Sequence, residues 1–477
     1  MNDHLAPQNQ YKDCDVRIPR YRYARIPLNN LTSGTVTVTP TATTLLEWKV
    51  PASSVINLAK SYVAYQYTWP LLANNYGYIF EDGCDFRTAY FGNGSGLGIV
   101  DLQYADAAVN VFRPIKTNIV DFLSKDELSE FYPCNQLATS NILPFSRDGL
   151  STGTDNASTN NYLEPQHLNI ASAPGTAILV SRYFPLNSFK GTFFNVDKDT
   201  CFGTDMYIRL FTNYGQRLGQ YTTTPSNPNA ANTQINANVT MSNVYLYLAI
   251  EENLDIRNSL LTALAHGSIK MTIPYLYSYR FSVSGNSSSG NVSLTLTKNY
   301  GRGVKSITVV PFNGQEYTNY AFDHSNVNGT KVSQIQTTMD GRPLTDYQLN
   351  CYNPNSSINP TGVGWSTPIN FADDYREALK FTDRSCLNGY PAYQSMWFYC
   401  DAWGVPQMSD DIPCPPENIP DCFDLLHTGD HIYALSALTP AIQTNTNNCY
   451  TSGLINYVYV QFIRTLEIQP DGIVLSP

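Results

Sequence analysis

Three acidic residues close together in the chain, Glu81, Asp82 and Asp85, are the first candidates for chemistry. A pair of carboxylates at a suitable separation cleaves glycosidic bonds, and several carboxylates together bind a hard cation such as Ca²⁺. The segment that carries them, FEDGCDF, contains a glycine and is typical of a turn, where most acidic clusters are simply solvated. We therefore predict no catalytic or metal-binding role for these residues, and we keep a glycosidase as an alternative.

Two other segments contain the residue types of known enzyme motifs. Asp323, His324 and Ser325 are the residue types of a hydrolase triad, but neighbours in an extended segment point to opposite faces and cannot form the required relay. The glycine-rich stretch FGNGSGLGIV at residues 91–100 imitates a phosphate-binding loop, yet no Lys-Ser/Thr pair follows it and no helix begins after it. We predict a structural turn for the first segment and a flexible loop for the second.

A third candidate is a metal site near the C-terminal end. His427 and His431 are four residues apart, and Cys414 and Cys422 lie upstream. Gly429 between the histidines favours a loop over a helix, and the cysteines are further apart than the ligands of a zinc knuckle. We predict free thiols and surface histidines here, so the sequence as a whole predicts no catalytic residue, no cofactor-binding residue, no cofactor and no metal.

The element around which the chain is organised lies just past its middle, in ENLDIRNSLLTALAHG. Apolar residues recur there at helical spacing: Ile256, Leu260 and Leu264. Asn253 or Asp255 can cap the start, and Gly267 stops the pattern. We predict a short amphipathic helix over residues 253–267 that links two β domains.

A long strand follows this helix. Apolar and aromatic residues occupy every odd position from 269 to 283, with mostly polar residues between them, which predicts a strand with one buried face. Pro274 has no N–H to donate to a neighbouring strand. We therefore expect this strand at a sheet edge, or bulged at Pro274.

Length and composition favour a two-domain β protein. The chain has 477 residues and 53.2 kDa, more than one core normally holds. It contains 34 Tyr, while the 29 Gly and 29 Pro are spread between periodic runs as turn residues. Charged residues make up only 14%, so uncharged polar side chains must cover much of the surface. The net charge of −10 argues against a basic nucleic-acid binder.

The N-terminal residues differ from the rest. We find no apolar region typical of a signal peptide and no run of eighteen apolar residues, so the ten cysteines are expected to be free thiols. Four arginines alternate with apolar residues and no acid intervenes: Arg17, Arg20, Arg22 and Arg25. Such a segment docks onto nucleic acid, anionic lipid or a neighbouring subunit, or is a solvated tail. We expect residues 1–32 to be an arm.

The rest of the chain has the same plan twice. Alternating patterns such as Leu46, Trp48 and Val50 predict strands, a helix-bearing insertion follows in each half, and further strands close each half. Long polar loops between short strands suit a jelly roll better than a propeller. The expected fold class is all-β, with two tandem antiparallel jelly-roll sandwiches and short helices in the loops. The expected division is an arm at 1–32, a first jelly roll at 33–252, a linking helix at 253–267 and a second jelly roll at 268–477.

Several segments in order resemble the double-jelly-roll major capsid proteins of icosahedral DNA viruses, particularly those of virophages and Polinton-like viruses. They are LYLAIEEN with the following helix, SIKMTIPYLYSYRF, VSLTLTKNYGRGVKSITVVPFNGQE, YAFDHSN, QIQTTMDGRPLTDYQLNC and YQSMWFYCDAWG. Over about half of the chain the residues themselves are similar, whereas the first half is similar more in the arrangement of its elements than in its residues. The C-terminal VYVQFIRTLEIQPDGIVLSP departs from the giant-virus members.

This resemblance implies a structural protein and no enzyme. Three copies would form a pseudo-hexagonal homotrimeric capsomer, and capsomers would tile an icosahedral shell around the DNA genome. The implied partners are the chain itself, neighbouring capsomers, and penton and minor capsid or cement proteins, with the arm contacting inner-layer proteins or a membrane and no sequence-specific nucleic-acid binding. The implied location is the virion capsid, after synthesis in the host cytoplasm. The alternative is a glycan-processing or glycan-binding protein built from two β-sandwiches.

Overall fold

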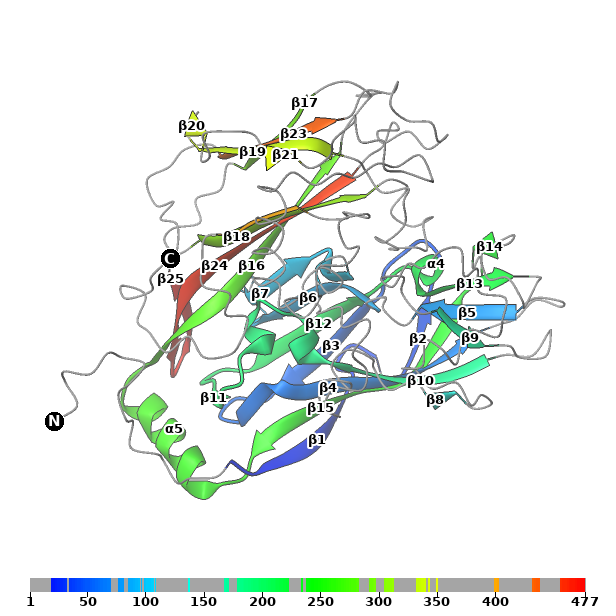
Figure 1. Cartoon of the computed structure of the whole chain (residues 1–477). Helices are drawn as coiled ribbons and strands as arrows, with labels where there is room; N and C mark the ends of the chain where they lie inside the picture. Colours follow the sequence, from blue (N-terminus) through cyan, green and yellow to red (C-terminus); the bar gives the residue numbers. More distant parts are fainter. Residues whose placement is uncertain are drawn as a thin grey trace, which may run out of the picture.

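The fold is known from a computed structural model, shown in Figure 1. It describes residues 19–31, 34–69, 76–80, 85–94, 96, 98–106, 108, 136–137, 167–170, 178–222, 233–234, 237–282, 291–296, 304–312, 332–339, 342–343, 349–350, 399–402, 431–437 and 455–476. Nearly all described elements are β-strands, and they pair in antiparallel sheets. The all-β prediction is confirmed.

The first half of the chain contains the largest sheet, with the strand order β1-β15-β4-β10-β8 and with β11 beside β4 and β2 beside β15. Its strands are β1 (Tyr21–Pro27), β2 (Thr35–Val38), β4 (Val55–Trp69), β8 (Gln136–Leu137), β10 (Ile178–Pro185), β11 (Thr200–Cys201) and β15 (Val239–Glu251). The longest of them, β4 and β15, pair with each other at the centre. The first and last parts of this half therefore lie side by side.

A four-stranded sheet faces the large one, in the order β3-β12-β6-β7. Its strands are β3 (Leu45–Val50), β12 (Met206–Thr212), β6 (Phe86–Gly92) and β7 (Gly98–Gln103). The predicted alternation in β3 is confirmed, because Leu46, Trp48 and Val50 are buried while the residues between them are not. Side chains from the two sheets meet, for example the rings of Tyr65 on β4 and Phe86 on β6 at 5.8 Å.

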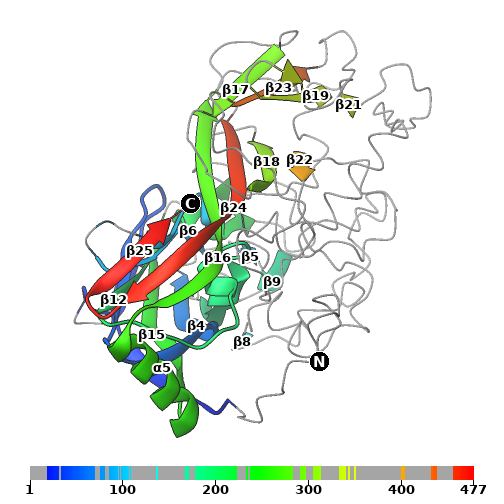
Figure 2. The same cartoon turned by 90° about the vertical axis from the view of Figure 1, so that its left-hand side faces the viewer.

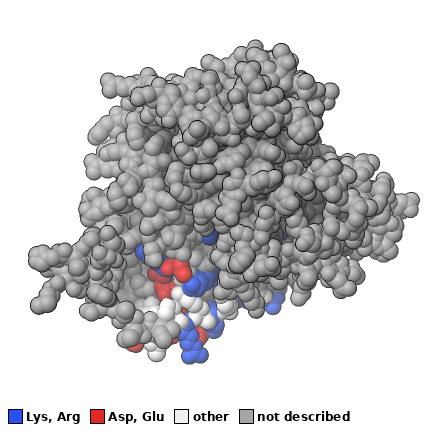
Figure 3. Space-filling view, viewed as in Figure 1, with Lys and Arg blue, Asp and Glu red and all other residues white. Residues whose placement is uncertain are grey.

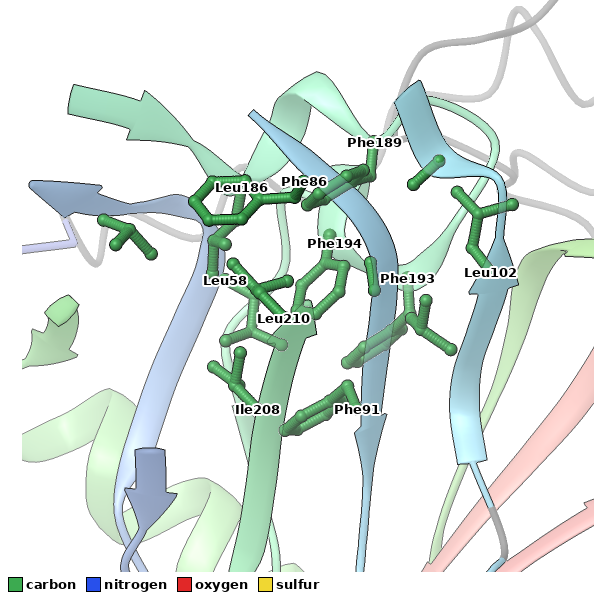
Figure 4. Close-up of a cluster of buried hydrophobic side chains, with 14 of the residues drawn as sticks. Leu58, Phe86, Phe91, Leu102, Leu186, Phe189, Phe193, Phe194, Ile208 and Leu210 are labelled. Carbon is green, nitrogen blue, oxygen red and sulfur yellow. The ribbon is translucent and has the colours of Figure 1, made fainter. Parts of the chain in front are cut away.

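Phenylalanines fill the space between these sheets (Figure 4). Two short 3₁₀-helices follow β10: η3 (Leu186–Ser188), with Phe189 just after it, and η4 (Phe193–Asn195), which carries the buried Phe193 and Phe194. The ring of Phe91 stacks on Phe193 at 6.0 Å and meets Phe202 edge-on at 5.4 Å. Each such side chain contributes about 1.5–3 kcal/mol by leaving water. This cluster is the core of the first sandwich.

A smaller sheet extends the first half, on the right in Figure 1, in the order β14-β13-β5-β9. Its strands are β14 (Thr233–Gln234), β13 (Gly219–Thr222), β5 (Tyr76–Phe80) and β9 (His167–Ile170). The short helix α4 (Gly215–Leu218) immediately precedes β13. Residues 223–232, between β13 and β14, lie outside the described residues.

The predicted helix over residues 253–267 is confirmed as α5 (Leu254–His266). The Asn253 side chain accepts a hydrogen bond from the Asp255 N–H at 3.0 Å, which satisfies one of the free donors of the first turn. Leu264 is buried, and Leu260 packs against the same core. The helix ends before Gly267, so its capping and its apolar face match the sequence pattern.

The second half contains two five-stranded sheets that lie one above the other in both views (Figures 1 and 2). One has the order β16-β24-β18-β22, with β25 beside β24, and its strands are β16 (Ile269–Ser282), β24 (Ile455–Gln469), β18 (Val304–Phe312), β22 (Tyr399–Ala402) and β25 (Gly472–Ser476). The other has the order β17-β23-β19-β20, with β21 beside β19, and its strands are β17 (Asn291–Leu296), β23 (His431–Ala437), β19 (Val332–Met339), β20 (Arg342–Pro343) and β21 (Leu349–Asn350).

Strand β16 is the long strand that the sequence predicts, and among the described strands it pairs only with β24. Pro274 therefore lies in an edge strand, as its missing N–H requires. In the second sheet of this half, Met339 of β19 pairs with Arg342 of β20. One detail differs from the prediction: Leu276 and Ser278, on the face expected to be exposed, are buried too.

The expected arm needs a correction. Residues 21–27 are strand β1, which pairs with β15 along its whole length. Both Arg20 and Arg22 form ion pairs with Glu252, the latter at 2.9 Å, and the guanidinium of Arg25 stacks on the ring of Tyr245 at 3.6 Å. In the view of Figure 3, basic and acidic side chains lie together in the part of the surface that the structure describes. These three arginines thus bind this chain itself, while Arg17 and the rest of residues 1–18 lie outside the described residues.

Candidate functional site: a buried ion pair and the junction of the two sandwiches

Of the three acidic candidates, Asp85 is described, and it is buried in the first sandwich at 2% exposure. It immediately precedes β6, and its carboxylate points toward the opposite sheet. There Tyr65 of β4 and Arg182 of β10 face each other in the strand register. Arg182 Nη1 contacts Asp85 Oδ1 at 2.6 Å, and the hydroxyl of Tyr65 donates to Asp85 Oδ2. The three side chains bridge the two sheets.

Electrostatic interactions within this cluster favour the charged form of Arg182 and the neutral form of Tyr65. Burial works against the charge of Arg182, but the neighbouring Asp85 carboxylate outweighs it and raises the pKa of Arg182. Burial, with Asp85 beside it, also raises the pKa of the Tyr65 hydroxyl well above its usual value. Both Asp85 oxygens are engaged by internal partners. The expectation of a solvated turn is wrong for Asp85, and the arrangement suits structural support rather than attack on a substrate. Glu81 and Asp82 lie outside the described residues.

A second buried ion pair, which the sequence patterns did not indicate, lies near the first. Arg87 of β6 is 3.4 Å from Asp106, and the amide of Asn213 donates to the same Asp106 oxygen at 3.2 Å. The guanidinium of Arg87 also lies 5.0 Å from the ring centre of Tyr104 and 4.9 Å from that of Tyr214. Its partners come from segments far apart in the chain, so local sequence holds no sign of this cluster.

The other predicted motifs are partly placed. The glycine-rich stretch is largely a hairpin: Gly92 at the end of β6 pairs with Gly98 at the start of β7, and Gly94 adopts a positive φ of 81°. The expectation that no helix begins after this stretch is wrong, because Ala105, Asp106 and Ala108 are helical just beyond β7. The glycines themselves lie in and between two paired strands, so the stretch is not a wholly flexible loop. His431 begins β23, whereas His427, Cys414, Cys422 and the Asp323–His324–Ser325 segment lie outside the described residues.

Among the described residues there is no group of three His, Cys, Asp or Glu side chains arranged to hold a metal ion. Over the same part of the chain, no helix is both long enough and apolar enough to cross a membrane. Cys201 is a free cysteine and is buried, and burial raises its thiol pKa to about 11.

The two sandwiches meet where β7 packs against β16 (Figure 1). The Gln103 N–H donates to Ser278 Oγ at 3.1 Å across this contact. The Tyr459 hydroxyl of β24 donates to the Tyr104 carbonyl at 2.6 Å, and the rings of Tyr104 and Tyr457 lie 4.8 Å apart. Tyr104 has a positive φ of 54°, which is costly for a bulky residue. The junction therefore holds a strained backbone in place.

Two glycines allow a close approach at the same junction. A side chain at Gly203 would place its Cβ against the Pro470 carbonyl oxygen, in the turn between β24 and β25. Gly191, with φ of 72°, lies against the buried Gln461 side chain, whose Nε2 would be 3.2 Å from a Cβ at position 191. At Gly203, main chain thus contacts main chain without an intervening side chain. Such contacts fix the orientation of the second sandwich on the first more firmly than a flexible linker would.

Comparison with known proteins finds no sequence family and no curated protein that matches the chain. Solved structures do match. VP54 of PBCV-1, as fitted into a reconstruction of the virophage Sputnik, gives a TM-score of 0.53 at 10% identity and covers 98% of this chain and 99% of that one. A chain of the PBCV-1 virus capsid gives the same values. A chain of the Sputnik virophage structure gives a TM-score of 0.51 at 12% identity over 99% of this chain and 92% of that one.

These neighbours are viral major capsid proteins, and the likeness extends over nearly the whole chain. At such low identity it establishes the fold alone. The fold is a double jelly roll, with each β-sandwich of the chain as one jelly roll. The predicted fold class is confirmed.

Proposed function

We propose that this chain is the major capsid protein of an icosahedral DNA virus and that it acts by assembly, without enzymatic activity. One observation carries the proposal: the double jelly roll aligns over 98% of this chain and 99% of PBCV-1 VP54, which leaves no room for a separate catalytic domain in the alignment. The same fold over the same length favours the same mechanical task. The virion capsid would be its location, after synthesis in the host cytoplasm.

The functional unit is a homotrimer. Three double jelly rolls bring six similar sandwiches around a threefold axis and give a pseudo-hexagonal outline, which tiles a shell. A closed cyclic assembly of identical chains uses the same pair of surfaces at each contact. The low charged fraction of 14% supports this, because surfaces poor in charge cost less to desolvate when copies pack together.

The junction of the two jelly rolls supports the same proposal. A capsomer keeps its outline only if the two sandwiches of each chain hold a fixed orientation. The contacts of Gly203 with the Pro470 turn and of Tyr104 with β24 supply that rigidity. We propose the division of the chain into an arm, a first jelly roll up to residue 252, a linking helix and a second jelly roll from residue 268, with β1 counted in the first jelly roll.

The remaining partners are part of the same proposal. Capsomers would contact neighbouring capsomers, penton proteins and minor capsid or cement proteins, and the residues before β1 would contact inner-layer proteins or a membrane. No sequence-specific contact with nucleic acid is proposed, in keeping with the net charge of −10. The alternative remains a glycan-processing or glycan-binding protein. The burial of Asp85 takes away one of the carboxylates on which that alternative depended.

The proposal is tested by imaging the purified protein by electron microscopy and by measuring glycan binding on the same sample. We expect particles with threefold symmetry and a pseudo-hexagonal outline, and no affinity for glycans. Single-chain particles that bind or cleave glycans would overturn the proposal in favour of the alternative.

A further inference from the structure

A cluster of carboxylates lies where β1 and α5 begin, at the base of the first jelly roll. Its centre is Glu251, the last residue of β15, which is fully buried at 0% exposure. Glu251 Oε1 accepts the backbone N–H of Arg20 at 2.9 Å and that of Asn253 at 2.7 Å. One carboxylate oxygen therefore holds the residue just before β1 and the residue that caps α5. The second oxygen, Oε2, is buried and has no hydrogen-bond partner among the described residues.

Asp199 is the second member of the cluster. It stands just before β11, the strand on which α5 packs. The hydroxyl of Tyr21 donates to Asp199 Oδ1 at 2.9 Å, and Tyr21 is also the register partner of Glu251. The buried amide of Asn57 donates to Asp197 Oδ1 at 2.8 Å and approaches Asp199 Oδ1 at 3.5 Å. Asp199 thus helps to hold β1 on the sheet through its hydrogen bond with the Tyr21 hydroxyl.

The charges around the cluster do not balance. Three carboxylates meet there, and Lys60 of β4 pairs with Asp197 at 2.7 Å. The arginines at the start of β1 pair with Glu252 instead. Arg257 on α5 has a buried Nε with no partner among the described residues. Within that part of the chain, neither Asp199 nor Glu251 forms an ion pair.

We propose that this cluster is a proton-dependent latch: Asp199 takes up a proton as pH falls, and its neutral form holds β1 and the start of α5 to the first jelly roll more firmly than its charged form does. The latch stands independently of the proposed function. The pH would then control how firmly the first jelly roll holds two segments: β1, which follows the N-terminal residues, and the start of α5, which leads to the second jelly roll.

The direction follows from the environment of Asp199. Burial raises its pKa, and the neighbouring carboxylates Glu251 and Asp197 raise it further, against the opposing effects of the Tyr21 and Asn57 hydrogen bonds. The folded state therefore binds the proton more tightly than the unfolded state does, where the pKa is near the ordinary value for Asp. The stability that this group contributes is fully present below the pKa of the unfolded state, and it is lost as pH rises through the raised pKa of the folded state.

The test compares wild-type protein with Asp199→Asn, which mimics the neutral form permanently, by thermal unfolding between about pH 4.5 and 8. We expect the variant to have a Tm about 2–5 °C above wild type at the high end and a smaller difference at the low end. The matched control is Asp205→Asn, which removes a carboxylate that pairs with Lys49 outside the cluster and should not raise the Tm at high pH. A Tm difference that does not change with pH, or a variant less stable than wild type at pH 8, would overturn the latch.

Two further readouts keep the test decisive. Hydrogen exchange in residues 19–27 and 254–266, corrected for intrinsic rates, should slow in wild type as pH falls and should stay constant in Asp199→Asn. Tyr21→Phe removes a hydrogen bond that favours charged Asp199, so it should move the rise in protection to higher pH. Unchanged pH dependence in Tyr21→Phe would contradict the latch even if Asp199→Asn failed to fold. All of these are measured on the purified chain, so the outcome does not depend on capsid assembly.

Discussion

Replacing Asp85 by Asn tests whether the carboxylate that first suggested chemistry is instead a structural support. Asn has nearly the same shape as Asp but carries no charge. The substitution leaves the guanidinium of Arg182, which is 3% exposed, buried beside a neutral amide. Removing one partner of a buried ion pair costs about 3–5 kcal/mol, because the other charge stays uncompensated. For a domain of this size that corresponds to a fall in Tm of about 6–20 °C.

The assay is thermal unfolding at neutral pH, followed by circular dichroism. The matched control is Lys49→Gln, which breaks the exposed pair between Lys49 and Asp205 at 2.6 Å. Exposed pairs contribute little, so the control should unfold close to wild type. The double variant Asp85→Asn with Arg182→Met removes both buried charges, and we expect it to be more stable than Asp85→Asn alone.

Two results would refute this reasoning. One is a Tm for Asp85→Asn that equals that of the Lys49→Gln control. The other is a normally stable Asp85→Asn protein that has lost a glycan-cleaving activity, which would give Asp85 a role in catalysis.

Two further substitutions and one deletion test how the junction of the two jelly rolls, the helix α5 and the strand β1 contribute to stability. Gly203→Ala should lower the free energy of unfolding by about 1–3 kcal/mol, because the methyl group overlaps a backbone carbonyl oxygen, while Gly267→Ala, which has open space around it, should leave the thermal midpoint unchanged. Leu264→Ala should cost about 2–4 kcal/mol in chemical denaturation, whereas Leu254→Ala, on the exposed side of α5, should cost far less. Deleting residues 1–27 removes β1 and should lower the Tm; an unchanged Tm would show that β1 adds nothing to the sheet.

Regular elements could be predicted from the sequence wherever one face of an element is buried. In β3 the core residues Leu46, Trp48 and Val50 alternate with more exposed ones, so the periodicity reports burial directly. In α5 both the cap and the stop signal are local in sequence. The edge position of β16 followed from one residue, Pro274, because a missing donor restricts where a strand can pair.

Strand β1 could not be predicted from the sequence because it buries no face completely. Its residues are all at least partly exposed, and its arginines are typical of a solvated tail. What holds it is backbone pairing with β15, a strand from the far end of the same jelly roll, and contacts such as that of Arg25 with Tyr245. Charged side chains also suit a sheet edge, since they prevent pairing with other chains.

The buried ion pairs could not be predicted either, because their partners lie far apart in the chain. Asp85 and Arg182 are separated by 97 positions, and only the packing of one sheet on another brings them together. The type of Asp85 suggested chemistry, but its role depends on burial, which a turn-like sequence does not reveal. The cluster of Asp199 and Glu251 likewise exists only once β1, β11 and β15 are assembled.

The central claim is that the chain works as a trimeric building block of a shell, and its mass in solution tests this most directly. Light scattering coupled to size exclusion needs no assay and no partner. The account predicts a mass of about 160 kDa, three times the 53.2 kDa of one chain, because a closed cyclic assembly of identical subunits has a defined size. A stable species at the mass of a single chain, unchanged at higher protein concentration, would contradict it.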